Sequence, residues 1–60
     1  MKKLEIMELE NEIVNDEIFT GIEESEDVTD LENCGTSGQN PNYNLWVVTL
    51  VDGTEIEILA

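Results

Sequence analysis

The sequence has no histidine and no arginine, and its only basic residues are Lys2 and Lys3. Against them stand fifteen acidic residues, so the formal net charge of the 60-residue chain is −13. Proteins that bind nucleic acids or anionic membranes use lysine and arginine to meet the phosphate groups. The composition therefore predicts no direct binding to nucleic acid or membrane, and it favours a basic protein as the partner.

The lack of histidine also removes the usual base of a nucleophilic catalytic set. The single cysteine, Cys34, lies among acidic and neutral residues, which disfavour its reactive thiolate form. Paired carboxylates could serve acid–base chemistry, but so short a chain leaves little room for an enclosed pocket of the usual size. We therefore expect no enzymatic activity and no cofactor.

Nothing in the sequence provides a covalent or metal staple. One cysteine cannot form an internal disulfide, and no zinc-binding set of cysteine and histidine exists. The stretch from Asp30 to Pro41 has Gly35 at the sixth position of a calcium loop, but Cys34 and Pro41 stand where ligands are needed. We expect no metal site, and a homodimer or a bound partner is the remaining way to bury more surface.

Long apolar runs are missing as well. No stretch approaches the length of about 20 apolar residues that a membrane-spanning helix needs. Glutamates begin at Glu5, so the first residues do not resemble the apolar region of a signal peptide. The unpaired Cys34 is compatible with a reducing compartment, and a cytoplasmic location is expected.

The clearest structural signal is a β-hairpin over residues 45–60. Two apolar segments, Leu45–Val51 and Thr54–Ala60, are joined by Asp52-Gly53, a pair typical of a two-residue type I′ turn. This turn would place Val51 opposite Thr54. The predicted core face of the hairpin is then Leu45, Val47, Val51, Ile56, Ile58 and Ala60, and the other face carries Trp46, Val48, Leu50, Glu55, Glu57 and Leu59.

Residues 2–14 predict an amphipathic helix that packs on the hairpin through Ile6, Leu9 and Ile13. The opposite side of this helix would carry a row of glutamates. Residues 17–24 predict a strand, because Ile18, Thr20 and Ile22 alternate with other residues. If Asn15-Asp16 forms a turn between two strands, the fold becomes a small all-β antiparallel sheet instead.

Residues 23–32 are dominated by acidic side chains, a composition typical of a solvated segment. Residues 33–44 are rich in glycine, asparagine and serine and predict a loop. The chain is thus expected to be a single small α+β domain over 1–60. Its parts would be an acidic half at 1–32, a loop at 33–44 and a hairpin at 45–60, with room for a third strand.

Size, charge and the missing catalytic groups favour a small acidic inhibitor. It would bind a basic host or defence protein, imitate nucleic acid, and be encoded by a phage or mobile element. One alternative is the precursor peptide of a ribosomally synthesised modified natural product. Another is an assembly subunit that pairs through the edge of its hairpin. The partner-binding residues predicted from the sequence are Glu5, Glu8, Glu12, Glu23, Glu24, Glu26, Asp27, Asp30 and Trp46.

Overall fold

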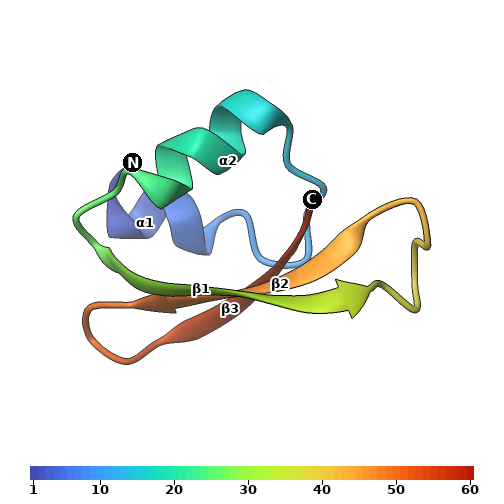
Figure 1. The fold of residues 1–60 in the computed structure, drawn as a ribbon. Helices are drawn as coiled ribbons and strands as arrows, with labels where there is room; N and C mark the ends of the chain where they lie inside the picture. The colour runs from blue at the N-terminus through green and yellow to red at the C-terminus, as the bar shows by residue number, and fades with distance from the viewer.

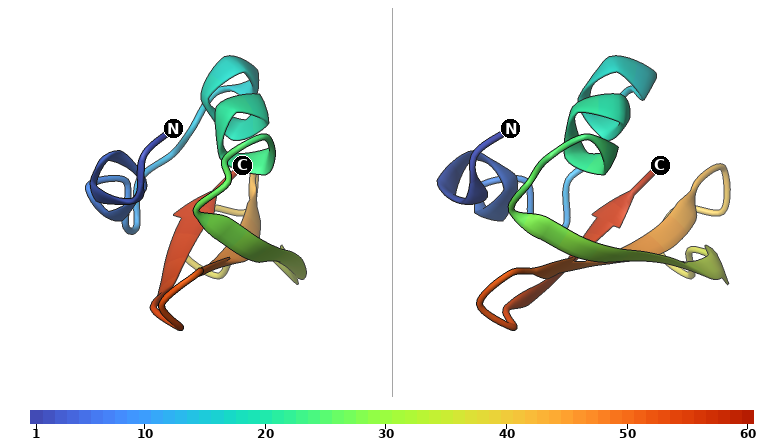
Figure 2. Two further views of the ribbon diagram at one scale, coloured as in Figure 1. Left: turned by 90° about the vertical axis from the view of Figure 1, so that its left-hand side faces the viewer. Right: turned by 60° about the vertical axis from the view of Figure 1, so that its left-hand side comes forward.

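The computed structural model describes all of residues 1–60. Two short helices, α1 (Lys3–Met7) and α2 (Asp16–Glu23), precede the strands β1 (Val28–Thr36), β2 (Asn44–Leu50) and β3 (Glu55–Leu59). The strands form an antiparallel sheet in the order β1-β2-β3, and both helices lie over the same face of it (Figures 1 and 2). The expected α+β class is confirmed, as a small compact domain.

The N-terminal helix is much shorter than the predicted span of 2–14. It ends at Met7, and the chain then turns at Asn11, which adopts a positive φ of 64° that asparagine tolerates well. From there the chain runs beside β3, where the Val14 N–H donates to the Leu59 carbonyl at 2.9 Å. Bonds to the edge of β3 therefore replace the helical bonds that the longer helix would have made.

Two of the three predicted packing residues of this segment do reach the core. Ile6 is fully buried, and Leu9 is half-buried against the core cluster. Ile13, the third, is 50 % exposed, because the chain is already extended at that point and forms a bridge to Leu59.

The prediction of a strand at 17–24 is wrong, because residues 17–23 belong to the helix α2 and Glu24 is its C-cap. Asn15 is its N-cap, and the Asn15 side-chain oxygen accepts a hydrogen bond from the Ile18 N–H at 2.8 Å. Ile18 and Ile22 are four residues apart, which suits one face of a helix as well as the alternation of a strand. Ile22 is fully buried under this helix, and the N-cap decides between the two patterns.

The third strand is β1, which occupies the segment expected to be a solvated acidic block and the start of a loop. Only Val28 and Leu31 of β1 are half-buried, so the apolar alternation typical of a strand is absent. The pairing with β2 is also irregular at two places, around Thr29 and again around Gly35, whose φ is +91°. Each irregularity inserts one residue and hides the period of two in the sequence.

The hairpin lies where it was predicted, but its register differs by one residue. The Leu50 N–H donates to the Thr54 carbonyl at 2.8 Å, so the loop contains three residues, 51–53. Gly53 has a φ of +87°, as expected for the left-handed last position of a three-residue loop. Val48 therefore pairs with Ile56 and Thr49 with Glu55. This shift reverses the predicted facing of the β2 side chains.

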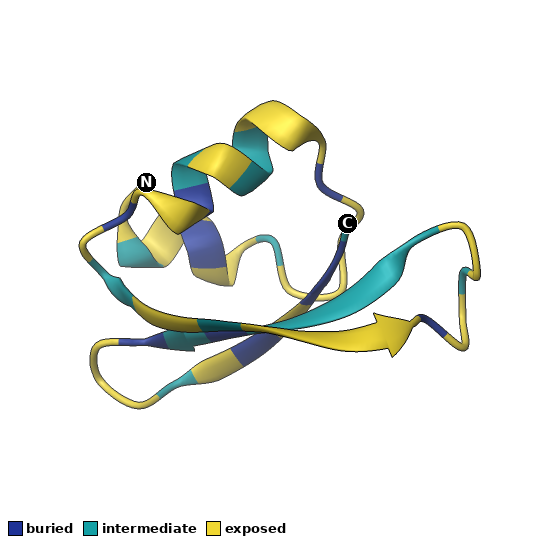
Figure 3. Cartoon of the chain, viewed as in Figure 1, coloured by how far each residue is buried: buried dark blue, intermediate teal, exposed yellow.

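The core accordingly lies on the other face of β2. Val51 was predicted to be buried but is 55 % exposed, and Val47 and Leu45 are outside the core cluster. Figure 3 shows the buried residues along β3 and the end of β2, under the helices. The buried cluster consists of Ile6, Val14, Ile22, Val48, Leu50, Ile56 and Ile58.

Candidate functional site

The face of the sheet that the helices leave bare carries two rows of side chains that contain acidic residues, and we call these two rows the open face. In one row Glu32 on β1 and Glu57 on β3 flank Val47 on β2. In the next row Asp30 and Glu55 flank the central Thr49 in the same way. Residues directly opposite one another on neighbouring strands share a face, so these carboxylates stand together. The open face is defined by Asp30, Glu32, Val47, Thr49, Glu55 and Glu57.

The spacing of these carboxylates follows from sheet geometry. Residues two apart on one strand are separated by about 6.8 Å, and the two outer strands are about 9.6 Å apart. All four acidic residues of the open face are exposed, and none of their side chains takes part in a hydrogen bond or ion pair. The open face is thus a regular array of four uncompensated negative charges.

The centre of the open face is partly apolar. Val47 and Thr49 are half-buried between the acidic rows, and Leu45 continues β2 beyond them. Lysine and arginine carry a long apolar stem below the charged head. Such a side chain can lay its stem on β2 and reach a carboxylate on either neighbouring strand, so the open face suits basic side chains of a protein.

A second acidic region lies on the helical side of the sheet. It surrounds an open hollow of about 390 Å³ between the N-terminus and the turn after α2. Here the structure brings together four sequence-predicted residues from distant parts of the chain, and Met1, Lys2 and Ser25 complete the lining. These four residues are Glu5, Glu24, Glu26 and Asp27.

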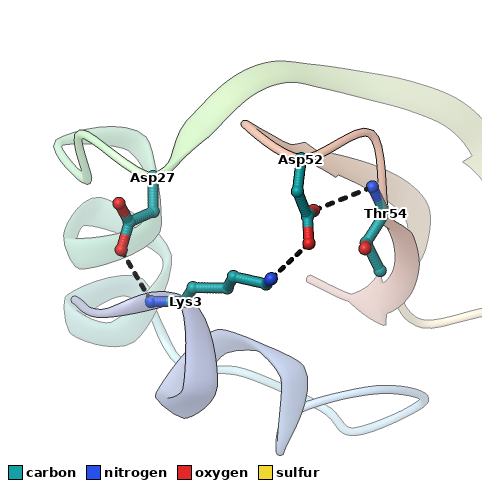
Figure 4. Close-up of polar contacts among 4 residues, drawn as sticks. All are labelled: Lys3, Asp27, Asp52 and Thr54. Atoms are coloured by element: carbon teal, nitrogen blue, oxygen red, sulfur yellow. Dashed lines mark hydrogen bonds and ion pairs between the residues drawn. The ribbon is translucent and has the colours of Figure 1, made fainter.

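Several of the groups at this hollow are used by the fold itself. The Asp27 carboxylate accepts the Lys3 backbone N–H at 2.8 Å, and the Lys3 ammonium pairs with Asp52 in the hairpin loop (Figure 4). The Ser25 hydroxyl donates to the Met1 carbonyl and accepts the Asp27 N–H at 3.2 Å. This network joins the N-terminal segment to two turns, which gives the region a structural role.

Asp52 is the one acidic group whose titration is clearly shifted. A hydrogen bond from the Lys3 ammonium, followed by the bond from the Thr54 backbone N–H at 3.0 Å, lowers the pKa of Asp52 to about 2. The Asp52 carboxylate therefore stays ionised at acidic pH values at which an aspartate without these hydrogen bonds is already protonated.

The remaining sequence-predicted residues are scattered. Glu23 lines a shallow hollow of about 280 Å³ beside β1, together with Asp30, which also belongs to the open face. The predicted glutamate row does not exist on one helix. Glu8 is the C-cap of α1, and Glu12 lies in the segment that pairs with β3.

Trp46 belongs to the covered face and not to an exposed one. It pairs with the buried Ile58, and its ring meets that of Phe19 edge to face, with centroids 4.8 Å apart at 71°. Trp46 is half-buried and packs against the core cluster. The contact with Phe19 connects β2 to α2, so the tryptophan stabilises the packing of the helix on the sheet.

Sequence reasoning missed Glu32, Glu55 and Glu57 as site residues. The alternation of Glu55 and Glu57 with Ile56 and Ile58 is visible in the sequence and does place the two glutamates on one face. The two-residue turn, however, placed them beside Val48 and Leu50. Only the three-residue loop puts them opposite Val47 and Thr49.

No three acidic or cysteine side chains approach closely enough to hold a metal ion. None of the helices has the length and apolar character needed to cross a membrane. The chain matches no protein family, no curated protein and no solved structure.

Proposed function

We propose that this chain is a small acidic inhibitor that binds a basic, nucleic-acid-binding protein and covers the surface that the nucleic acid would contact. The observation that carries the proposal is the open face, where Asp30, Glu32, Glu55 and Glu57 form two rows without a cation among them. The chain acts by binding and not by catalysis.

The density of charge supports imitation of a duplex. Duplex DNA carries one negative charge for about every 1.7 Å of its axis, so about 6.8 Å of duplex carries about four. The open face presents four carboxylates over that same length. For the whole molecule, thirteen net charges share a longest extent of 29 Å, or one for about every 2.2 Å. Both values are close to the charge density of the duplex.

The open face is a better contact surface than the hollow at the N-terminus. At the hollow, Lys2 partly offsets the carboxylates, and Asp27 is already bonded to the Lys3 N–H. The open face has no basic residue and an apolar centre at Val47. A partner can therefore gain charge pairs and some apolar burial without breaking a bond inside the chain.

A host nuclease, polymerase or defence complex is the class of target that fits this chemistry. A phage or mobile element would be the source of such an inhibitor, and the cytoplasm, where these targets work, would be its location. Unlike charges speed association, so binding should become slower as salt rises.

The experiment compares two variants of equal net charge. Glu32, Glu55 and Glu57 are replaced by glutamine in the open-face variant, and Glu10→Gln, Asp16→Asn and Glu17→Gln form the control. Both changes bring the net charge from −13 to −10, and the control residues are exposed and lie in the helical layer. Thermal melting first establishes that both variants are folded.

Immobilised wild-type chain is used to capture proteins from bacterial lysate at low salt, and each captured protein is purified. Fluorescent duplex DNA is then titrated against the complex. We expect DNA and chain to displace each other, and only the open-face variant to bind poorly. The proposal fails if DNA and chain bind together without weakening each other, or if both variants lose affinity equally.

A further inference from the structure

The two outer edges of the sheet are in different states. The edge of β3 is covered by the chain's own residues 11–14, through bonds from the Asn11 N–H to the Glu57 carbonyl and from the Leu59 N–H to the Glu12 carbonyl. No segment of the chain lies along the outer edge of β1, which is exposed over most of its length (Figure 3). The free edge of the fold is thus β1 and not the hairpin edge considered from the sequence.

The register identifies the backbone groups that face outward. Asn44 exchanges two hydrogen bonds with Ala60, at 2.9 and 3.0 Å, so even-numbered residues of β2 bond to β3. Odd-numbered residues of β2 then bond to β1, where their partners are Asp30 and Glu32. The N–H and C=O groups of Leu31 and Asn33 therefore point away from the sheet.

Side chains on the two sides of this edge differ in character. On the open face, Asp30 and Glu32 stand beside the edge. On the covered face, Leu31 is half-buried and borders the shallow hollow of about 280 Å³, whose rim includes Glu23 on α2. A strand added at this edge would place alternate side chains beside the carboxylates and the others beside Leu31.

We propose that β1 accepts an extended segment of a partner protein as a further antiparallel strand. The segment has basic side chains opposite Asp30 and Glu32 and an apolar side chain opposite Leu31, which reaches the hollow beside α2. The inference rests on the backbone edge of β1, so it holds whether or not the partner also binds nucleic acid.

Charge argues against a second copy of the chain as the occupant. Antiparallel pairing of two β1 strands would bring Asp30 and Glu32 of one copy beside the same residues of the other, and like charges on neighbouring strands are destabilising. A basic segment turns the same carboxylates into favourable partners.

The test uses a synthetic peptide as long as β1, with alternating lysine and valine, and two N-methylated forms of it. In the proposed register the valine N–H groups face Leu31 and Asn33, and the lysine N–H groups face solvent. Methylation of the valine nitrogens should weaken binding at least about tenfold, because it removes the inter-strand bonds. Methylation of the backbone nitrogens of the lysines leaves these bonds in place and should change binding little. Both methylated peptides carry the same charge, so a difference in their affinity reports the backbone bonds alone.

A pair of protein variants repeats the test from the other side. Asn33→Pro removes an outward N–H that the fold does not use, at an edge position where proline is tolerated. Asn33→Ala controls for the loss of the Asn33 side chain, which accepts the Gly35 N–H at 2.8 Å. We expect only the proline variant to lose affinity for the peptide. In the wild type, amide hydrogen exchange at Leu31 and Asn33 should slow when the peptide binds.

Equal affinity of the two methylated peptides would overturn the proposal, since it would show attraction by charge alone. Greater weakening by lysine methylation would overturn the register. If the chain forms a concentration-dependent dimer and Asn33→Pro abolishes it, the occupant of the β1 edge is a second copy of the chain and not a partner segment. If the peptide binds as expected but DNA does not compete with the chain for its partner, only the function proposed above is contradicted.

Discussion

The two faces of the sheet use the same strands for opposite purposes. On the covered face, Val48, Ile56 and Ile58 are at most 3 % exposed and pack under the helices. On the open face, the alternate residues Glu55 and Glu57 stand exposed beside Val47. Along β3, exposed acidic and buried apolar side chains therefore alternate with the period of two residues of a strand.

This difference teaches how so acidic a chain can fold. Every carboxylate is exposed except that of Asp27, which is half-buried and accepts the Lys3 N–H. The core cluster contains no polar side chain, so no charge has to be desolvated. The cost of the net charge is repulsion across the surface, which water and salt reduce.

The largest expected effect is the difference in stability between an alanine replacement on the covered face and one on the open face. Ile58→Ala should cost about 2–5 kcal/mol of unfolding free energy, because it leaves a cavity in the covered face. A domain of this size has about 3–5 kcal/mol in total. We expect the variant to be largely unfolded by circular dichroism, whereas Val47→Ala on the open face should remain folded. Equal losses in the two variants would contradict the assignment of faces.

The next effect concerns the loop that sets the register. Gly53→Val forces a β-branched residue into a φ of +87° and should cost about 1–3 kcal/mol. Gly38→Ala is the matched control, because Gly38 has no positive φ and no atom would touch an added Cβ. Urea denaturation should show a clear loss for the valine variant only; two unchanged midpoints would mean that Gly53 is not held in this conformation.

A smaller effect is expected from the ion pair in the hairpin loop. The pKa of Asp52 is about 2 in the folded chain against 3.8 unperturbed, so the ionised carboxylate favours the folded state. This contribution is fully present above pH 3.8 and is lost as the pH falls through about 2. Asp52→Asn should therefore melt below the wild type at neutral pH, and the two melting temperatures should converge near pH 2. A gap that persists there would point to a cause other than ionisation.

The smallest effect concerns repulsion on the open face. Two unit charges about 10 Å apart in water interact by about 0.4 kcal/mol. Replacement of Glu32, Glu55 and Glu57 by glutamine should therefore raise the melting temperature slightly at low salt, and moderate salt should remove the advantage. A melting temperature that drops on this replacement would show that attractive pairs dominate the open face.

The sequence was sufficient to predict the class, the hairpin position and the burial of Ile6, because these depend on strong local signals. It was insufficient for β1, since a mostly exposed edge strand with two irregularities shows no apolar alternation. The prediction was also wrong at α2, because the spacing of Ile18 and Ile22 fits both a helix and a strand. The N-cap formed by Asn15 favours the helix. The two rows of the open face could not be predicted for a related reason. A turn longer by one residue moved the glutamates from beside Val48 to beside Val47.

That register can be measured directly by nuclear magnetic resonance. In the three-residue loop, Thr49–Glu55 and Val47–Glu57 are non-hydrogen-bonded pairs, with Cα atoms about 4.5 Å apart. Strong contacts between the α-protons of these pairs are the result we expect, and they would place both glutamates on the open face. Strong α-proton contacts between Leu50 and Glu55 and between Val48 and Glu57 would show the two-residue turn instead. The open face, and the function proposed from it, would then be contradicted.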